Sequence, residues 1–102
     1  MLKTKQRVYL RSLAMKEKAK FQIGKNGLDE NLFIDVYSYL LKHEIVKISV
    51  LETCDCEKED IINFFTREID GVEIEFIQHI GRVYIFYMPS KKAKNPIELP
   101  KK

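Results

Sequence analysis

The stretch FQIGKNGLDENLFIDVYSYLLKHEIVKISV, residues 21–50, decides the fold that the sequence predicts. It opens with a short apolar segment, residues 21–23, which glycines follow at once and which therefore predicts a strand. Apolar residues then recur every four positions, the spacing of an amphipathic helix that extends to about Lys42. Residues 46–50 alternate apolar and polar side chains and predict a half-buried strand. Strand, helix and strand in succession are typical of an α/β layered fold.

The flanking segments supply the remaining elements. Helical spacing predicts one helix over about residues 4–17 and another over residues 57–69, where an Asp-Gly pair is expected to end it. Alternation predicts a strand over residues 72–76, and β-branched and aromatic residues predict a last strand over residues 82–87. The short connection containing Gly81 predicts a hairpin between these two strands. The predicted order is α-β-α-β-α-β-β, with three helices packed on a four-stranded mixed sheet.

Length and composition are those of one domain. The chain has 102 residues, of which 45% are hydrophobic and 32% charged, as is typical of a globular domain with a single core. We expect the domain to span residues 1–88, followed by a basic tail rich in proline and lysine over residues 89–102. Apolar runs are too short to cross a bilayer, and the basic N-terminal segment lacks the apolar stretch of a signal peptide. We therefore expect a cytoplasmic protein without a membrane partner.

Charge is distributed unevenly along the chain. Residues 1–25 contain eight basic residues and one acidic residue, residues 26–81 contain four and thirteen, and residues 82–102 contain six and one. Both ends are therefore basic, although the net charge is only +3. Such asymmetry favours a polyanion that both ends contact, while ordinary solvated lysine is the alternative on charge alone.

The strongest candidate for a binding site is the loop formed by Gly24, Lys25, Asn26 and Gly27. Glycines let a backbone approach a ligand closely, and the first amides of the following helix are free to bind an anion. Lys25 adds a positive charge, so the loop predicts a clamp on a phosphate backbone by the logic of the GxxG loop in KH domains. The alternative is a strand-to-helix turn with Asn26 as the N-cap. The acidic Asp29 and Glu30 count somewhat against a nearby phosphate.

Further basic residues are candidates for contacts with a phosphate backbone. Arg7 and Arg11 lie one turn apart on a face of the first helix that its apolar residues leave free, and Lys3 and Lys5 precede them. Arg82 follows the predicted turn and could grip a phosphate or pair with an acidic neighbour. An ordinary charged surface is the alternative for each arginine. The aromatic residues of the last strand are expected to fill the core rather than to stack on bases, namely Tyr84, Phe86 and Tyr87.

No pattern typical of catalysis or metal binding is recognisable. Cys54 and Cys56 lie too close together for an unstrained disulfide, and with His43 and His79 they do not match the spacing of a zinc site. No nucleophile has a base at a recognisable spacing, and the glycines of the loop are too close together for a nucleotide-binding P-loop. We therefore expect reduced thiols, no metal, no cofactor, no small-molecule substrate and no enzymatic activity.

Five segments of the chain together resemble a known family. They are LKTKQRVYLRSLA at residues 2–14, FQIGKNGL at 21–28, HEIVKISVL at 43–51, IGRVYIFYMPS at 80–90 and NPIELPKK at 95–102. In this order they resemble the YhbY-type CRM-domain proteins, named for chloroplast RNA splicing and ribosome maturation. One departure is Met88, where the family usually has an arginine before Pro-Ser, which puts one basic contact in doubt.

The resemblance implies both a fold and a partner. The fold would be the α/β fold of the C-terminal domain of bacterial translation initiation factor three. The function would be that of a stand-alone bacterial RNA-binding domain associated with ribosomal RNA in precursors of the large (50S) ribosomal subunit. The family's RNA-contacting loop falls on residues 24–27, and its basic surface would include Arg7, Arg11 and, beside the loop, Arg82.

We expect the RNA-binding protein to be a monomer. Other functions compete with this interpretation. A domain similar to a translation factor would bind the small subunit, and co-sedimentation with precursors of the two subunits separates the alternatives. An adaptor would bind another protein through the acidic middle of the chain, and a pull-down that survives nuclease treatment would favour it. A nuclease would cleave RNA with or without divalent metal ions.

Overall fold

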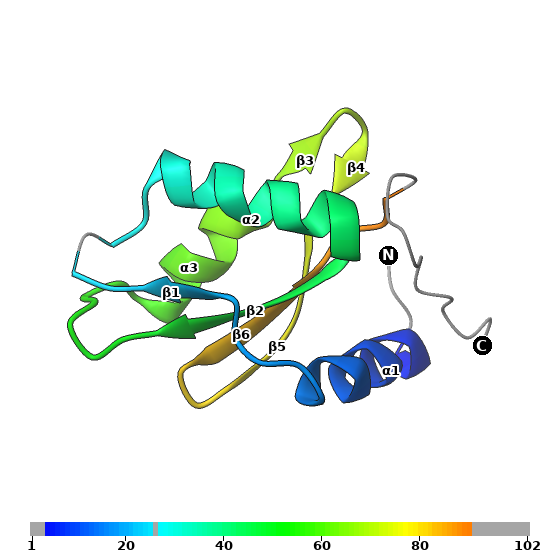
Figure 1. Ribbon diagram of the computed structural model, residues 1–102, viewed down its shortest axis with the longest axis horizontal. Coiled ribbons are helices and arrows are strands. Elements are labelled where there is room, and N and C mark those ends of the chain that lie inside the picture. Colours follow the sequence, from blue (N-terminus) through cyan, green and yellow to red (C-terminus); the bar gives the residue numbers. More distant parts are fainter. Residues whose placement is uncertain (1–3, 26, 91–102) are drawn as a thin grey trace.

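Four strands form the main sheet of the computed structural model, which describes residues 4–25 and 27–90 (Figure 1). They lie in the order β1-β2-β6-β5, with the bounds β1 Phe21–Ile23, β2 Ile45–Val50, β5 Glu75–Ile80 and β6 Val83–Tyr87. β1 runs parallel to β2, whereas β6 is antiparallel to both of its neighbours. The predicted mixed sheet is therefore confirmed, and the hairpin predicted at Gly81 joins β5 to β6.

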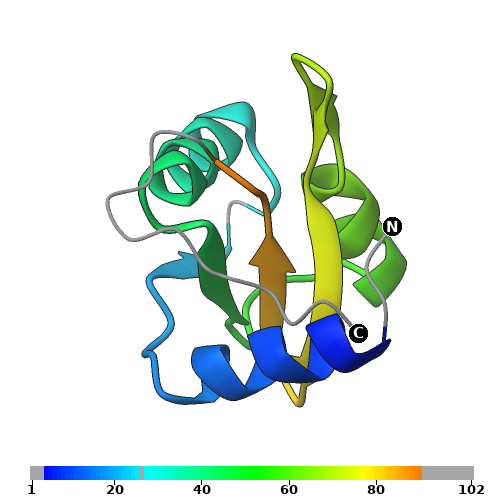
Figure 2. The same cartoon turned by 90° about the vertical axis from the view of Figure 1, so that its right-hand side faces the viewer.

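Three helices cover the two faces of this sheet. They are α1 (Thr4–Met15), α2 (Glu30–His43) and α3 (Lys58–Phe65). Helices α2 and α3 lie on one face, while α1 crosses the opposite face (Figures 1 and 2). The predicted order of helices and sheet strands is confirmed, with one additional hairpin described below.

Strand β6 contributes to two separate hydrophobic cores. Because neighbouring side chains of a strand point to opposite faces, Tyr84 and Phe86 pack toward α2 and α3, while Ile85 and Tyr87 pack toward α1. All four side chains are buried, so the aromatic residues of this strand fill the core as predicted. The smaller core under α1 consists of Leu10, Ala14, Ile77, Ile85 and Tyr87.

The prediction of a helix over residues 57–69 was wrong in its second half. Helix α3 ends at Phe65, and the next residues form β3 (Glu68–Ile69), which pairs with β4 (Val72–Glu73) in a small separate sheet. Asp70 and Gly71 have φ values of 52° and 80°, the left-handed geometry of a two-residue hairpin turn. The Asp-Gly pair therefore closes a hairpin rather than ending a helix.

The single strand predicted over residues 72–76 is also divided between two sheets. β4 belongs to the small hairpin, and β5 begins only at Glu75. The residue between them, Ile74, is buried in the larger core, and its backbone N–H donates to the carbonyl oxygen of Arg67 at 2.9 Å. Arg67 and Ile74 lie opposite each other beyond the last paired residues of the hairpin, so this bond extends the β3–β4 pairing by one step before the chain enters β5.

The C-terminal end of the described chain is fastened to the end of α2. Glu44 caps this helix in a left-handed conformation, with φ 65°, and its carboxylate accepts a hydrogen bond from the backbone N–H of Ser90 at 2.7 Å. The Ser90 hydroxyl donates to the carbonyl oxygen of Leu41 at 2.6 Å. Most of the predicted tail, residues 91–102, lies outside the described residues.

Candidate functional site

Three connections meet at one end of the main sheet, on the left in Figure 1. They are the glycine loop, which we define as residues 24–27, the connection over residues 51–57, and the turn containing Arg82. The backbone N–H of Leu51 donates to the carbonyl oxygen of Ile23 at 2.8 Å, just before the glycine loop. The backbone N–H of Val50 donates to the carbonyl oxygen of Arg82 at 2.7 Å. Ordinary sheet hydrogen bonds thus hold the two predicted basic loops at the same end.

The backbone conformation of the glycine loop favours glycine at position 27. The N–H of Gly27 donates to the carbonyl oxygen of Gly24 at 2.9 Å and closes the turn. Gly27 has φ 68°, a left-handed conformation that costs most other residues about 1–2 kcal/mol. A Cβ atom there would lie 3.6 Å from the sulfur of Cys56, an ordinary contact, so conformation rather than crowding selects glycine. Lys25 is exposed in this loop, and Asn26 lies outside the described residues.

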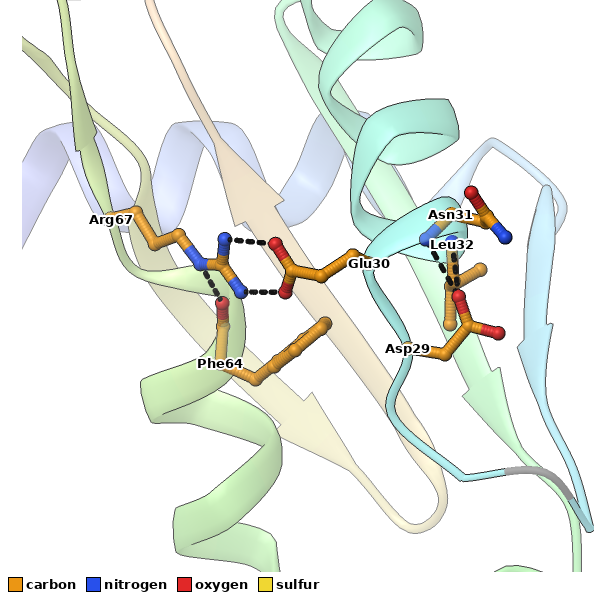
Figure 3. A network of polar contacts seen from close by, with 6 residues as sticks. All are labelled: Asp29, Glu30, Asn31, Leu32, Phe64 and Arg67. Atoms are coloured by element: carbon orange, nitrogen blue, oxygen red, sulfur yellow. Dashed lines mark hydrogen bonds and ion pairs between the residues drawn. The ribbon is translucent and has the colours of Figure 1, made fainter.

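The predicted anion site at the start of α2 is occupied by a side chain of the protein itself (Figure 3). Asp29, not Asn26, is the N-cap, and its carboxylate accepts hydrogen bonds from the backbone N–H groups of Asn31 at 2.6 Å and Leu32 at 3.2 Å. These are among the first amides of the helix, which a phosphate would otherwise approach. The expectation that they are free is wrong, so a phosphate at the glycine loop must be held by Lys25 and the loop backbone.

Glu30, the second acidic residue beside the loop, is paired with Arg67 (Figure 3). Two hydrogen bonds, of 2.9 and 2.6 Å, join the guanidinium to the carboxylate, and the Nε atom of Arg67 donates to the carbonyl oxygen of Phe64. The hydrogen bond with Arg67 lowers the pKa of Glu30. The helix amides offset the charge of Asp29 and Arg67 offsets that of Glu30, so neither carboxylate presents an uncompensated charge beside the loop.

Lys25 and Arg82 are two basic side chains at this end that remain available to a ligand. Both are exposed, and no carboxylate within residues 4–25 and 27–90 forms an ion pair with either of them. The alternative that Arg82 pairs with an acidic neighbour therefore finds no support in this part of the chain. Two cations beside a glycine loop are suited to bind a phosphate backbone.

The arginines of α1 lie elsewhere on the domain. Arg7 is half-buried, and its Nη1 atom donates to the carbonyl oxygen of Phe76 on the edge strand β5 at 2.6 Å. Phe76 pairs with Phe86, toward the end of the hairpin remote from its turn. Arg7 was expected to be free and is not, because it is bonded to Phe76. The structure also does not bring it to the glycine loop. Lys5 and Arg11 are exposed on α1, while Lys3 lies outside the described residues.

Three lysines between α1 and β1 were not singled out from the sequence. Lys16, Lys18 and Lys20 are all exposed, and the backbone N–H of Lys20 donates to the carbonyl oxygen of Lys47 on β2 at 2.9 Å. The segment MKEKAK, residues 15–20, places a lysine at every second position, which is the signal that could have marked them. These lysines extend the basic surface of α1 toward the start of β1.

The two cysteines form no disulfide, and the sulfur of Cys56 lies next to Gly27 of the glycine loop. Both thiols are free and half-buried, and the backbone N–H of Cys56 donates to the sulfur of Cys54 at 3.3 Å. The hydrogen bond with Cys54 and burial raise the pKa of Cys56, which favours the neutral thiol. Within residues 4–25 and 27–90, no three side chains among His, Cys, Asp and Glu lie close enough to hold a metal ion. No helix in these ranges is long and apolar enough to span a membrane.

Comparisons with known proteins agree with the fold described above. The family model of the CRS1 / YhbY (CRM) domain matches residues 2–88. The chain is 35% identical over 100 residues to a Bacillus subtilis protein named "Probable RNA-binding protein YqeI", covering 98% of this chain and 100% of that protein. It is also 35% identical over 101 residues to a Haemophilus influenzae protein named "RNA-binding protein", covering 99% and 97% of the two chains. The solution structure of SAV1595 from Staphylococcus aureus, described as a candidate RNA-binding protein, superimposes with a TM-score of 0.74 at 36% identity, covering 98% of this chain and all of that chain.

Proposed function

The chain belongs to the CRS1 / YhbY (CRM) domain family, and on that premise we propose that it is a non-catalytic RNA-binding protein. Relatives that match it over nearly their full length are named RNA-binding proteins. The single observation that carries the proposal is that Lys25 and Arg82 are both exposed at the glycine-loop end of the main sheet. Two available cations next to a backbone that folds tightly through Gly27 form a surface for a polyanion.

The mechanism that we propose is capture of the RNA backbone. Lys25 supplies a mobile charge, Arg82 offers a planar guanidinium that grips two oxygens of one phosphate, and the loop backbone approaches the RNA between them. Asp29 occupies the first amides of α2, so the helix end adds no phosphate contact of its own. Contacts of this kind position a protein on structured RNA and read little sequence.

The more specific part of the proposal concerns the RNA and the assembly state. We propose that the target is ribosomal RNA in precursors of the large ribosomal subunit. The protein would act in the cytoplasm as a monomer. Residues 1–88 would form the RNA-binding domain, and the basic tail over residues 89–102 would add charge to it. The resemblance stated from the sequence supports the ribosomal target.

Co-sedimentation with ribosomal precursors tests this proposal. The protein should migrate with precursors of the large subunit in a sucrose gradient, and the double variant Lys25→Ala with Arg82→Ala should shift to the free fraction. Lys42→Ala, which removes an exposed lysine at the far end of α2, serves as the control and should co-sediment like the parent. Binding only to small-subunit precursors would favour the translation-factor alternative, and a protein partner retained after nuclease treatment would favour the adaptor.

A further inference from the structure

A hollow of about 400 Å³ opens at the edge of the main sheet, at the other end of β1 from the glycine loop. It exists because β1 is shorter than its neighbour: the three residues of β1 pair only with Ile48, Ser49 and Val50 of β2. The first half of β2 pairs with β6 on one side, but on the other side no residue of β1 pairs with it, and there it lines the hollow. The volume falls within the range of roughly 300–1,000 Å³ that small ligand sites occupy.

The rim of this hollow is strongly basic. Among the residues that the structure describes, four lysines line it, and Glu17 is the single acidic residue. The Nζ atom of Lys47 donates to the backbone carbonyl oxygen of Glu17 at 3.1 Å, which fixes the connection between α1 and β1 across the hollow. The excess of positive charge favours an anionic ligand. The four lysines are Lys16, Lys18, Lys20 and Lys47.

One wall of the hollow is aromatic. Tyr39 and His43, one turn apart on α2, stack with ring centroids 4.2 Å apart and an interplanar angle of 29°. Phe21 meets the ring of Tyr39 edge-on, with an angle of 87°, and thereby fixes its orientation. His43 is the exposed member of the stack, and both rings also line a second hollow on their other side. The pair thus forms a ridge onto which a further flat ring could stack.

We propose that this hollow holds one unpaired nucleotide of the bound RNA, with its base stacked on the ridge of His43 and Tyr39 and its phosphate held by the lysine rim. The inference rests on the proposed function and adds a second contact point to it. Stacking accepts any base, so this contact would add affinity without selecting sequence. Strand β1 separates the hollow from the glycine loop by three extended residues, about 10 Å, so one RNA strand could reach both.

Crosslinking locates the nucleotide directly. Purified bacterial ribosomal RNA serves as the probe, ultraviolet light crosslinks it to the full chain, and mass spectrometry identifies the crosslinked residues. We expect crosslinks at His43 or Tyr39. The double variant Lys18→Ala with Lys20→Ala should reduce them, because the phosphate is no longer held at the rim. Lys58→Ala, which removes an exposed lysine of α3 outside the hollow, should leave them unchanged.

Affinity for the same RNA separates stacking from charge. His43→Ala should weaken binding at least roughly fivefold without changing its salt dependence, because a stacking contact with one base is lost and no charge on the lysine rim changes. His43→Phe keeps a flat aromatic ring at this position and should retain the affinity of the parent. Both changes are at an exposed position, so both proteins should fold.

The possible outcomes distinguish this inference from the proposed function. If the parent binds ribosomal RNA and the glycine-loop variants weaken it, but His43→Ala binds normally and no crosslink maps to the ridge, the nucleotide site is refuted while the RNA-binding function stands. If the parent binds no RNA, both fail. If adenosine monophosphate saturates the hollow and ribosomal RNA does not displace it, the site is one for free nucleotides and the inference is wrong.

Discussion

Arg7 on α1 and Phe76 on β5 are joined across the smaller core by a hydrogen bond from Nη1 to the backbone carbonyl oxygen, with an N···O distance of 2.6 Å. Phe76 directly precedes a bulge in β5, since it pairs with Phe86 while the next paired residue is Gln78. A carbonyl on an edge strand beside a bulge has a free acceptor lone pair, which Arg7 satisfies. The guanidinium therefore fixes α1 on the sheet, a structural role that its neighbour Arg11 does not share.

We predict that Arg7→Ala and Arg11→Ala differ in stability. Arg7→Ala should lower the free energy of unfolding by about 1–2 kcal/mol, because it removes a charge-assisted hydrogen bond at a half-buried site. Arg11→Ala should change it by no more than about 0.5 kcal/mol, as is usual for an exposed side chain. Urea denaturation of both variants measures the difference. Equal stabilities would show that the bond to Phe76 contributes nothing.

Lys25→Ala should weaken RNA binding while leaving the fold intact. The side chain is exposed and forms no ion pair within the described ranges, so its loss should cost within about 0.5 kcal/mol of stability. One phosphate contact disappears, which should reduce the slope of log affinity against log salt by about one. A salt titration of parent and variant measures this. A parent affinity that does not change with salt would exclude phosphate contacts altogether.

Two substitutions at Gly27 separate backbone strain from charge. Gly27→Asn and Gly27→Asp are nearly equal in shape, and both must adopt the left-handed conformation with φ 68°, so each should cost about 1 kcal/mol of stability. Gly27→Asp also places a negative charge where RNA should approach, so it should bind RNA more weakly than Gly27→Asn. Melting curves establish that the two proteins are equally folded. Identical binding by both would place the RNA away from this loop.

The double change Cys54→Ser with Cys56→Ser should preserve RNA binding. The thiols are free, and the hydrogen bond from the Cys56 N–H to the Cys54 sulfur is one that a serine hydroxyl oxygen can also accept. Metal analysis of purified protein provides the second measurement. Stoichiometric zinc in the parent, lost in the double variant together with RNA binding, would show that the cysteines belong to a metal site.

Alkaline pH should destabilise the domain through Tyr87. Burial, together with the negative charges of Glu44 and Glu75, raises the pKa of this tyrosine from its usual value of 10.0 to about 12. The unfolded chain therefore ionises first, and stability that is present below pH 10 is lost between pH 10 and 12. The loss should be about 2–3 kcal/mol, and Tyr87→Phe should reduce it. Tyr9→Phe, at an exposed tyrosine, is the control in denaturation measured across this pH range.

Sequence patterns predicted most of the fold because most of its elements are locally periodic. Helix α2 and strands β2 and β6 repeat their apolar residues at the spacing of their own secondary structure. The error at Asp70 and Gly71 arose because an Asp-Gly pair is a signal both for the end of a helix and for a hairpin turn. The division of residues 72–76 between two sheets was missed because a continuous alternation of apolar and polar residues does not show where a strand changes its partner.

Only those parts of the candidate site that consecutive residues form could be predicted from the sequence. The glycine loop is a local feature, and Asp29 directly before α2 carried the usual signal of an N-cap. The spacing of Arg7 and Arg11 suggested a free pair of cations. The hydrogen bond that occupies Arg7 depends on tertiary packing, which this spacing does not show. The hollow beside β1 depends on the unequal lengths of two paired strands and on the approach of α1 and α2, and therefore could not be found from the sequence.

The sharing of β6 between two cores has a consequence for the cooperativity of unfolding. Phe86 belongs to the larger core and Ile85, its neighbour, to the smaller one, so loss of β6 opens both together. We therefore predict that helix α1, which packs on β6 through the smaller core, unfolds together with the sheet. Amide hydrogen exchange should thus be slow in the helices on both faces of the sheet, in α1 as well as in α2 and α3. Helix α1 with its basic residues should form one foldon with the strands.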